Sequence, residues 1–158
     1  MVAALAIILS TSGFAATAAD SGAVSVRWPT LQPVVGPPIE PAQLDGRPVI
    51  LVFWATWCGF CERHNARIER LHRAVDPQAL RIVGMAIDGD AASVARLARQ
   101  RGWTFPQVLD EGRLRPRFTP RRLVPMTCVV DAQGQPQPCI PGEMSEDDVM
   151  ALRALAAR

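Results

Sequence analysis

Two cysteines with two residues between them, Cys58 and Cys61, follow directly on an apolar run. Residues 49–57 are almost continuously apolar and rich in β-branched and aromatic side chains, which predicts a buried strand. Residues 62–75 mix apolar and charged side chains in the pattern of an amphipathic helix. The sequence therefore predicts a strand that delivers Cys58 to the start of a helix.

This position favours thiol chemistry at Cys58. The unpaired backbone N–H groups and the dipole at a helix N-terminus stabilise a thiolate, which is the reactive form of cysteine. Cys61, one turn into the helix, is close enough to displace a mixed disulfide and close a ring with Cys58. The pair indicates thiol–disulfide exchange, with Cys58 as the nucleophile and Cys61 as the resolving cysteine.

A structural zinc site is the main alternative for such a pair. It usually needs a second cysteine pair or two spaced histidines. Cys128 and Cys139 lie on either side of an expected turn, and neither His64 nor His72 completes a zinc-finger spacing. We therefore expect no metal and no small-molecule cofactor.

The sequence around the cysteines resembles the active site of the thioredoxin superfamily. Residues 53–61, Phe-Trp-Ala-Thr-Trp-Cys-Gly-Phe-Cys, are most similar to the exported bacterial thiol–disulfide oxidoreductases related to TlpA and ResA. Three further stretches resemble the family in the same order: 81–88, 105–110 and 124–131. The resemblance covers residues 35–157. It implies an α/β, thioredoxin-like fold, with a central mixed β-sheet flanked by helices and an N-terminal β-hairpin extension.

Several positions depart from the family pattern. Gly59 and Phe60, which are expected to shape the site, stand where the family commonly has a proline. His64 replaces a glutamate found in several relatives, and Val52 replaces the buried aspartate of thioredoxin. With both carboxylates missing, His64 is the local candidate for moving the proton of Cys61, which lies on the same helix face. The alternative is a solvated histidine on a polar helix face.

Two further features are expected beside the cysteines. Trp57 directly precedes Cys58 and is expected to shield one side of its sulfur. The resemblance implies that the Val124–Pro125 bond is cis and that its loop lies against the cysteines. X–Pro is the one bond at which the cis form costs little. The backbone of Val124 would then pair with an extended substrate as an added strand does, unless Pro125 is an ordinary trans turn proline.

Cys128 and Cys139 form a second constellation. If residues 131–135 form a hairpin turn, the two cysteines lie nearly opposite each other on antiparallel strands, close to disulfide distance. A second, structural disulfide is one account. Two free cysteines that act as small buried hydrophobes are another. A redox relay with Cys58 and Cys61 is the third.

Composition sets the outer limits. The chain of 158 residues suits a single domain, and 17 basic residues, all arginine, against 15 acidic ones give a net charge of +2. This balance gives no reason to expect nucleic acid as a partner. Five of the arginines cluster ahead of the proline loop: 113, 115, 117, 121 and 122. They either attract an acidic partner or form a solvated basic loop.

Residues 1–19 contain no charged side chain, and residues 2–9 are apolar. Small residues follow, so we expect a signal peptide; the alternatives are an uncleaved membrane anchor and an apolar N-terminal helix. Residues 20–158 would form a single thioredoxin-like domain. Export implies an oxidising compartment, for which a periplasm is the expectation.

These observations predict an exported thiol–disulfide oxidoreductase that acts on protein thiols and disulfides. The resemblance implies a reductase kept reduced by a membrane electron-transfer partner. The proline-free Gly59–Phe60 pair is closer to those of isomerases and oxidants, so either role remains an alternative. A metal-binding carrier and a peroxidase are the other classes, but the PxxxTxxC spacing of a peroxidase is absent. The sequence leaves the substrate and the oligomeric state open.

Overall fold

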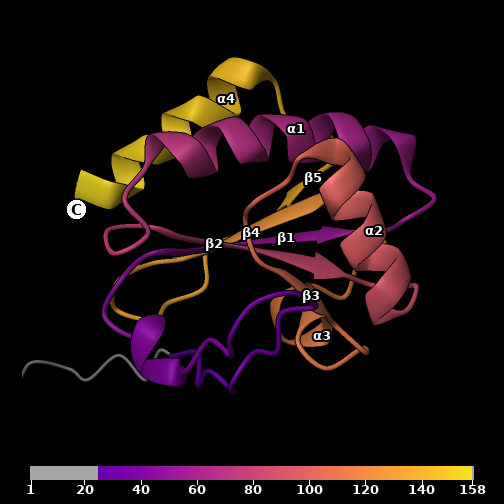
Figure 1. The fold of residues 1–158 in the computed structure, drawn as a ribbon. Coiled ribbons are helices and arrows are strands. Elements are labelled where there is room, and N and C mark those ends of the chain that lie inside the picture. Colours follow the sequence, from indigo (N-terminus) through magenta and orange to yellow (C-terminus); the bar gives the residue numbers. More distant parts are fainter. Residues whose placement is uncertain (1–24, 158) are drawn as a thin grey trace, which may run out of the picture.

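The computed structural model describes residues 25–157, which form a mixed sheet covered on both faces (Figure 1). The sheet has five strands in the order β3-β2-β1-β4-β5. Strands β1, β2 and β3 are parallel, β4 is antiparallel to β1, and β5 is antiparallel to β4. The strands are β1 (Val49–Trp54), β2 (Arg81–Ala86), β3 (Gln107–Leu109), β4 (Met126–Val130) and β5 (Ile140–Pro141). The mixed central sheet expected from the sequence is confirmed.

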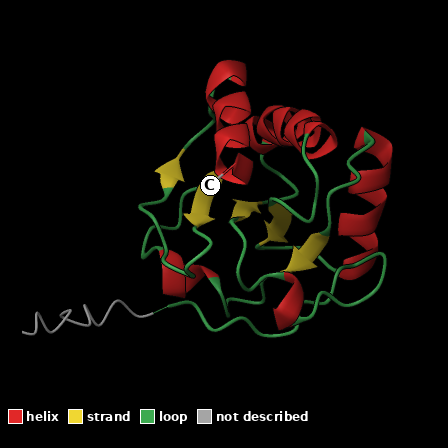
Figure 2. Cartoon of the chain, turned by 90° about the vertical axis from the view of Figure 1, so that its left-hand side faces the viewer, coloured by secondary structure: helices red, strands yellow, loops and turns green. Residues whose placement is uncertain are grey.

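The helices divide between the two faces of the sheet (Figures 1 and 2). They are α1 (Gly59–Ala74), α2 (Ala91–Arg101), α3 (Arg115–Phe118) and α4 (Glu146–Ala151), with 3₁₀ turns η1 (Pro41–Gln43) and η2 (Leu152–Ala157). Side chains of α1, α2 and α4 share one core with the sheet. The segment 26–44 and the residues around α3 share a second core on the other face. Both faces of β1 are therefore buried, which explains its unbroken apolar sequence.

A buried amide connects β3 to the strand that leads to the cysteines. The indole Nε1 of Trp54 donates to Oε1 of Gln107 over 2.9 Å. The Gln107 side chain lies directly over Gly84 of β2, where an added Cβ would come within 2.1 Å of the same oxygen. A larger residue at position 84 would therefore displace the Gln107 amide that holds Trp54.

The expected N-terminal β-hairpin is reduced to one isolated pair. Leu31 and Ile39 exchange two backbone hydrogen bonds of 2.9 Å, but no strand is formed on either side of them. The reason is the proline content, since proline has no N–H to continue a ladder. The prolines of this segment are Pro29, Pro33, Pro37, Pro38 and Pro41.

The last α-helix, α4, has Ser145 as its N-cap residue. Its hydroxyl accepts the N–H of Asp148 over 3.1 Å, and it also donates to the Asp148 carboxylate. The Asp148 side chain bonds this hydroxyl, not the backbone N–H of Ser145, so the two residues do not form a reciprocal capping box. Among residues 25–157, no helix has the length and apolar character needed to cross a membrane. The expected signal peptide, residues 1–19, lies outside the described residues.

Candidate active site

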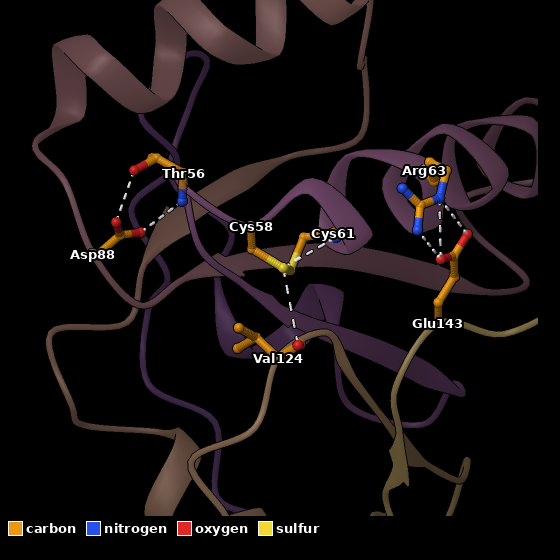
Figure 3. The surroundings of a disulfide bond; sticks show 7 residues. All are labelled: Thr56, Cys58, Cys61, Arg63, Asp88, Val124 and Glu143. Atoms are coloured by element: carbon orange, nitrogen blue, oxygen red, sulfur yellow. Dashed lines mark hydrogen bonds and ion pairs between the residues drawn. A yellow bond between two sulfur atoms is a disulfide. The ribbon is translucent and has the colours of Figure 1, made fainter.

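Cys58 is the N-cap residue of α1, at the helix start where the sequence placed it. Its sulfur accepts a hydrogen bond from the backbone N–H of Cys61 over 3.1 Å (Figure 3). The two cysteines form a disulfide with their Cα atoms 5.2 Å apart. Cys58 is 6% exposed and Cys61 is fully buried. An incoming sulfur can therefore reach Cys58 but not Cys61, which matches the roles of nucleophile and resolving cysteine.

The loop before β4 faces this disulfide. The Val124–Pro125 peptide bond is cis, and the carbonyl oxygen of Val124 lies 3.9 Å from the sulfur of Cys58 (Figure 3). Within the described part of the chain, the Val124 N–H has no hydrogen-bond partner. A main chain that offers a free donor next to a reactive sulfur can pair with an extended polypeptide.

A carboxylate at the end of β2 holds the loop that precedes Cys58. Asp88 accepts one hydrogen bond from the Thr56 N–H at 2.8 Å and another from the Thr56 hydroxyl at 2.7 Å (Figure 3). Asp90, close by, is the N-cap of α2. Over residues 25–157, no group of three or more histidine, cysteine, aspartate or glutamate side chains is arranged to hold a metal ion. The two hydrogen bonds that Asp88 accepts from Thr56 fix the turn between β1 and α1.

His64 is fully buried, so the solvated alternative for this residue is wrong. One ring nitrogen, Nδ1, accepts the N–H of Met144 at 3.3 Å, and the other, Nε2, lies 2.9 Å from the hydroxyl of Thr127. An Nδ1 that accepts a hydrogen bond carries no proton, so Nε2–H is the donor to Thr127. Burial, reinforced by the charge of Arg67, lowers the pKa of His64 to about 4. The ring is therefore neutral and bonded to groups other than Cys61.

This arrangement changes the expectation for His64. A base with a pKa of about 4 is a poor acceptor for a thiol proton at neutral pH. The ring instead joins α1 to β4 and to the loop that begins at Gly142. The buried position and the neutral charge of His64 both favour a structural role, in which the ring holds these elements together, over a role in proton transfer.

The same loop is held from outside by ion pairs. Glu143 accepts hydrogen bonds from Arg63 at distances from 2.8 to 3.2 Å (Figure 3). It is also paired with Arg67. One turn further along α1, Arg70 is paired with Glu146. The three arginines share one face of α1, so the helix that carries the cysteines is connected repeatedly to the start of α4.

Exposed apolar side chains surround Cys58. Trp57 is 73% exposed and Phe60 is 62% exposed. The side chain of Trp57 therefore lies largely in solvent, and the shielding of one side of the Cys58 sulfur by its indole stays a prediction. The guanidinium of Arg63 stands over the Phe60 ring at 4.7 Å from its centroid, a cation–π arrangement. The site thus consists of one nearly buried sulfur with exposed aromatic side chains next to it in the chain.

Cys128 and Cys139 form a second disulfide, with Cα atoms 4.3 Å apart. The β4–β5 register pairs Thr127 with Ile140, which places the two cysteines opposite each other. Cys128 belongs to the core on one face of the sheet, whereas Cys58 and Cys61 belong to the core on the other. A relay between the two pairs would have to cross the sheet, so this geometry favours a structural crosslink.

Sequence reasoning overlooked the polar residues on the buried face of α1. Besides His64, this face buries Asn65 and Glu69. Glu69 accepts the N–H and the hydroxyl of Thr104, at 2.6 and 2.7 Å, and so joins α1 to the segment before β3. Asn65 has no hydrogen-bond partner for either side-chain atom in the described residues. His72 is half-buried, with its ring 6.2 Å from that of Phe105.

The fold and the cysteine site together define a thioredoxin-like thiol–disulfide oxidoreductase. The chain belongs to the AhpC/TSA family, whose profile matches residues 29–135. Among curated proteins it is similar to the thiol-disulfide oxidoreductase ResA of Halalkalibacterium halodurans, with 29% identity over 75% of this chain and 68% of the relative. The ResA of Geobacillus kaustophilus is 30% identical over 66% of this chain and 60% of the relative. The matches thus span between 60% and 68% of these relatives' lengths.

Solved structures share the fold. A thioredoxin-family thiol:disulfide interchange protein from Chlorobium tepidum superposes with a TM-score of 0.71 and 23% identity, over 85% of this chain and 100% of that chain. A secreted Mycobacterium tuberculosis disulfide oxidoreductase homologous to DsbE of E. coli superposes with a TM-score of 0.68 and 24% identity, over 79% and 93% of the two chains. At these identities the structures establish the fold only.

Proposed function

We propose that the protein is exported and reduces disulfide bonds in protein substrates. One observation carries this proposal: the slightly exposed sulfur of Cys58 stands at the start of α1, with Cys61 buried behind it and the Val124 carbonyl in front. The dipole of a helix of 16 residues favours the thiolate at Cys58 once the disulfide is opened. The direction of the reaction rests on the resemblance to the TlpA and ResA branch.

The reaction takes two exchanges. In the reduced protein, the Cys58 thiolate attacks one sulfur of a substrate disulfide, which forms a mixed disulfide and releases one substrate thiolate. The Cys61 thiolate then attacks the Cys58 sulfur and releases the second substrate thiolate. The substrate gains two electrons and takes up two protons, while the protein is left with the Cys58–Cys61 disulfide.

A further donor must return the disulfide to the dithiol. The family resemblance supports a membrane electron-transfer partner that supplies two electrons by the same exchange chemistry. The apolar, uncharged residues 1–19 support export as a signal peptide or an anchor, with residues 20–158 as the thioredoxin-like domain in a periplasm. The description of the M. tuberculosis structure as a secreted protein supports the same location.

An oxidant or isomerase is the second candidate. Gly59 and Phe60 between the cysteines favour it. A protein with the same fold from Corynebacterium glutamicum is described as a thiol-disulfide isomerase. It is 16% identical over 87% of this chain and 98% of that one, with a TM-score of 0.72. The two candidates differ in the stability of the Cys58–Cys61 disulfide relative to the dithiol. They use the same residues.

The deciding experiment is the reduction potential of the Cys58–Cys61 pair. It is measured in glutathione buffers, with each cysteine's state determined by alkylation and mass spectrometry. A Cys128→Ala/Cys139→Ala variant removes the signal of the second disulfide. A value near that of thioredoxin, about −270 mV, supports the reductase. A value of about −180 to −120 mV overturns it in favour of the oxidant or isomerase. A pair that never cycles in any buffer overturns both.

A further inference from the structure

An open groove runs beside Cys58. Its volume is about 620 Å³, and its apolar lining includes Phe60, Val124, Pro125 and Met144. The groove lies between the start of α1, the cis-proline loop and the loop that follows β5. Its size suits an apolar side chain and its neighbours in an extended polypeptide.

The acidic residue that lines the groove, Glu143, is already ion-paired. Glu143 is engaged by Arg63 and Arg67, so this acidic side chain is not available to bind a basic substrate. Burial of a basic residue here would have to break an existing pair. The groove therefore receives apolar side chains.

The residues on the other side of Val124 carry unpaired positive charge. Arg121 and Arg122 are exposed, and within residues 25–157 neither forms an ion pair. From Gly112 to Val130 the chain has five arginines and no acidic residue. Leu123, between these arginines and Val124, is 58% exposed. Arg121 and Arg122 precede Val124 by only three and two residues, at no more than about 3.3 Å per residue, so a polypeptide that pairs with the backbone of Val124 comes within side-chain reach of this basic segment.

We propose that the protein selects polypeptide substrates that carry acidic residues on one side of the reacting cysteine and an apolar residue on the other. The apolar residue occupies the groove beside Phe60, and the acidic residues face Arg121 and Arg122. This inference rests on the proposed function, since it assigns a substrate class to the same site. Attraction between opposite charges raises the rate of encounter, and salt screens it over about 8 Å at physiological ionic strength.

The test uses two synthetic disulfide-bonded peptides that share a core sequence and differ only in their flanking residues, glutamate or lysine. The reduced protein is mixed with each peptide, and the second-order rate constant is followed by quenched alkylation. At low salt we expect the glutamate peptide to react about 3- to 10-fold faster, because each exposed charge pair contributes modestly. The preference should disappear in 0.5 M salt, roughly the range in which the Debye length falls to a few ångströms.

Matched variants locate the effect. Arg121→Gln/Arg122→Gln should abolish the preference, whereas Arg96→Gln/Arg99→Gln removes the same charge from exposed positions on α2 and should leave it intact. Equal rates for the two peptides, or loss of the preference in both variants, would overturn the inference. The inference would also be overturned if the protein formed a dimer that the Arg121→Gln/Arg122→Gln variant does not form, and if the wild type reduced both peptides at the same rate. An uncharged disulfide, hydroxyethyl disulfide, separates the two proposals: if it is not reduced either, the proposed function fails and the inference fails with it.

Discussion

The Nε2 atom of His64 lies 2.9 Å from the hydroxyl of Thr127, so the helix that carries both active-site cysteines is bonded to the strand after the cis proline. The other ring nitrogen of His64 accepts the N–H of Met144, which lines the groove beside Cys58. A single neutral ring therefore fixes the relative positions of the nucleophile, the proline loop and one wall of the groove.

Protonation of His64 should destabilise the folded protein in mild acid. Its pKa is lowered from 6.5 to about 4, so between these values the unfolded chain binds the proton and the folded one does not. Stability from this residue is complete above pH 6.5 and is lost as the pH falls through 4, about 3 kcal/mol in all. Urea unfolding of the oxidised protein at pH 7 and pH 4 measures the loss.

His64→Gln should be less stable at pH 7 but should lose about 3 kcal/mol less than the wild type between the two pH values. His72→Gln is the matched control. Burial also lowers the pKa of His72, but this ring is only half-buried, so its removal should change the pH dependence less. Equal pH dependence in His64→Gln and the wild type would contradict the buried, neutral ring.

Replacement of the buried cysteine should trap the substrate. In Cys61→Ser the mixed disulfide at Cys58 has no resolving thiol, so a covalent complex with a peptide disulfide should accumulate and turnover should be lost. Non-reducing gels and mass spectrometry detect the complex. Cys58→Ser should give no complex, because Cys61 is fully buried. A complex formed equally by Cys58→Ser would contradict the assignment of the two roles.

Removal of the Asp88 carboxylate should loosen the turn before Cys58. Asp88→Ala leaves the N–H of Thr56 without its partner, which should lower the free energy of unfolding by about 1–3 kcal/mol. The rate of reaction with hydroxyethyl disulfide should fall by about tenfold as the sulfur loses its fixed position. Asp76→Ala removes a comparable turn contact, to the N–H of Gln78, far from the cysteines. It should lower stability without lowering the rate; a fall in both variants would argue against a specific role of Asp88.

The second disulfide should contribute stability but no chemistry. Its cysteines are 11 residues apart, and closing a loop of that size stabilises a protein by about 3 kcal/mol. Cys128→Ala/Cys139→Ala should unfold more easily by this amount and should reduce peptide disulfides at the wild-type rate. Chemical denaturation and the alkylation assay test the two parts separately. A large loss of rate in this variant would instead support the hypothesis of a redox relay between the two cysteine pairs.

The unpartnered amide of Asn65 should cost stability. Asn65 is fully buried with neither side-chain atom hydrogen-bonded in the described residues. Asn65→Leu keeps a similar volume and removes two polar atoms, so the oxidised protein should gain about 1–3 kcal/mol. Asn65→Asp, which buries a charge instead, should be strongly destabilised. Lower stability of the leucine variant would show that the amide has a partner.

The parts of the site that are local in sequence could be predicted. The apolar run of β1 and the helix pattern after it placed Cys58 at a helix start, because strand, turn and helix are consecutive. The burial of His64 could not be predicted, since a polar residue in an amphipathic pattern is assigned to the solvent side. Its partners, Thr127 and Met144, are 63 and 80 residues away, and only the folded sheet brings them together.

Other differences have equally physical causes. The N-terminal segment was expected to form a hairpin, but a proline-rich chain lacks the N–H groups that a hairpin needs. Trp57 was expected to shield one side of the Cys58 sulfur because it directly precedes this cysteine, but the sequence did not indicate that its side chain would be 73% exposed. The exposure of an aromatic side chain beside the cysteines depends on what the site binds, and the periodicity of the sequence carries no information about that.

The disulfide between Cys128 and Cys139 fixes more than two strands. The N–H of Gly142, directly after β5, donates to the carbonyl oxygen of Pro125 over 2.8 Å, so the end of the cis-proline loop that enters β4 is anchored to the crosslinked strands. Such a loop has little conformational entropy left to lose when a polypeptide pairs with it. The ordering cost of binding then falls on the substrate. Chains that are still unfolded, and can become extended without breaking native contacts, meet a rigid template at the moment their cysteines are accessible.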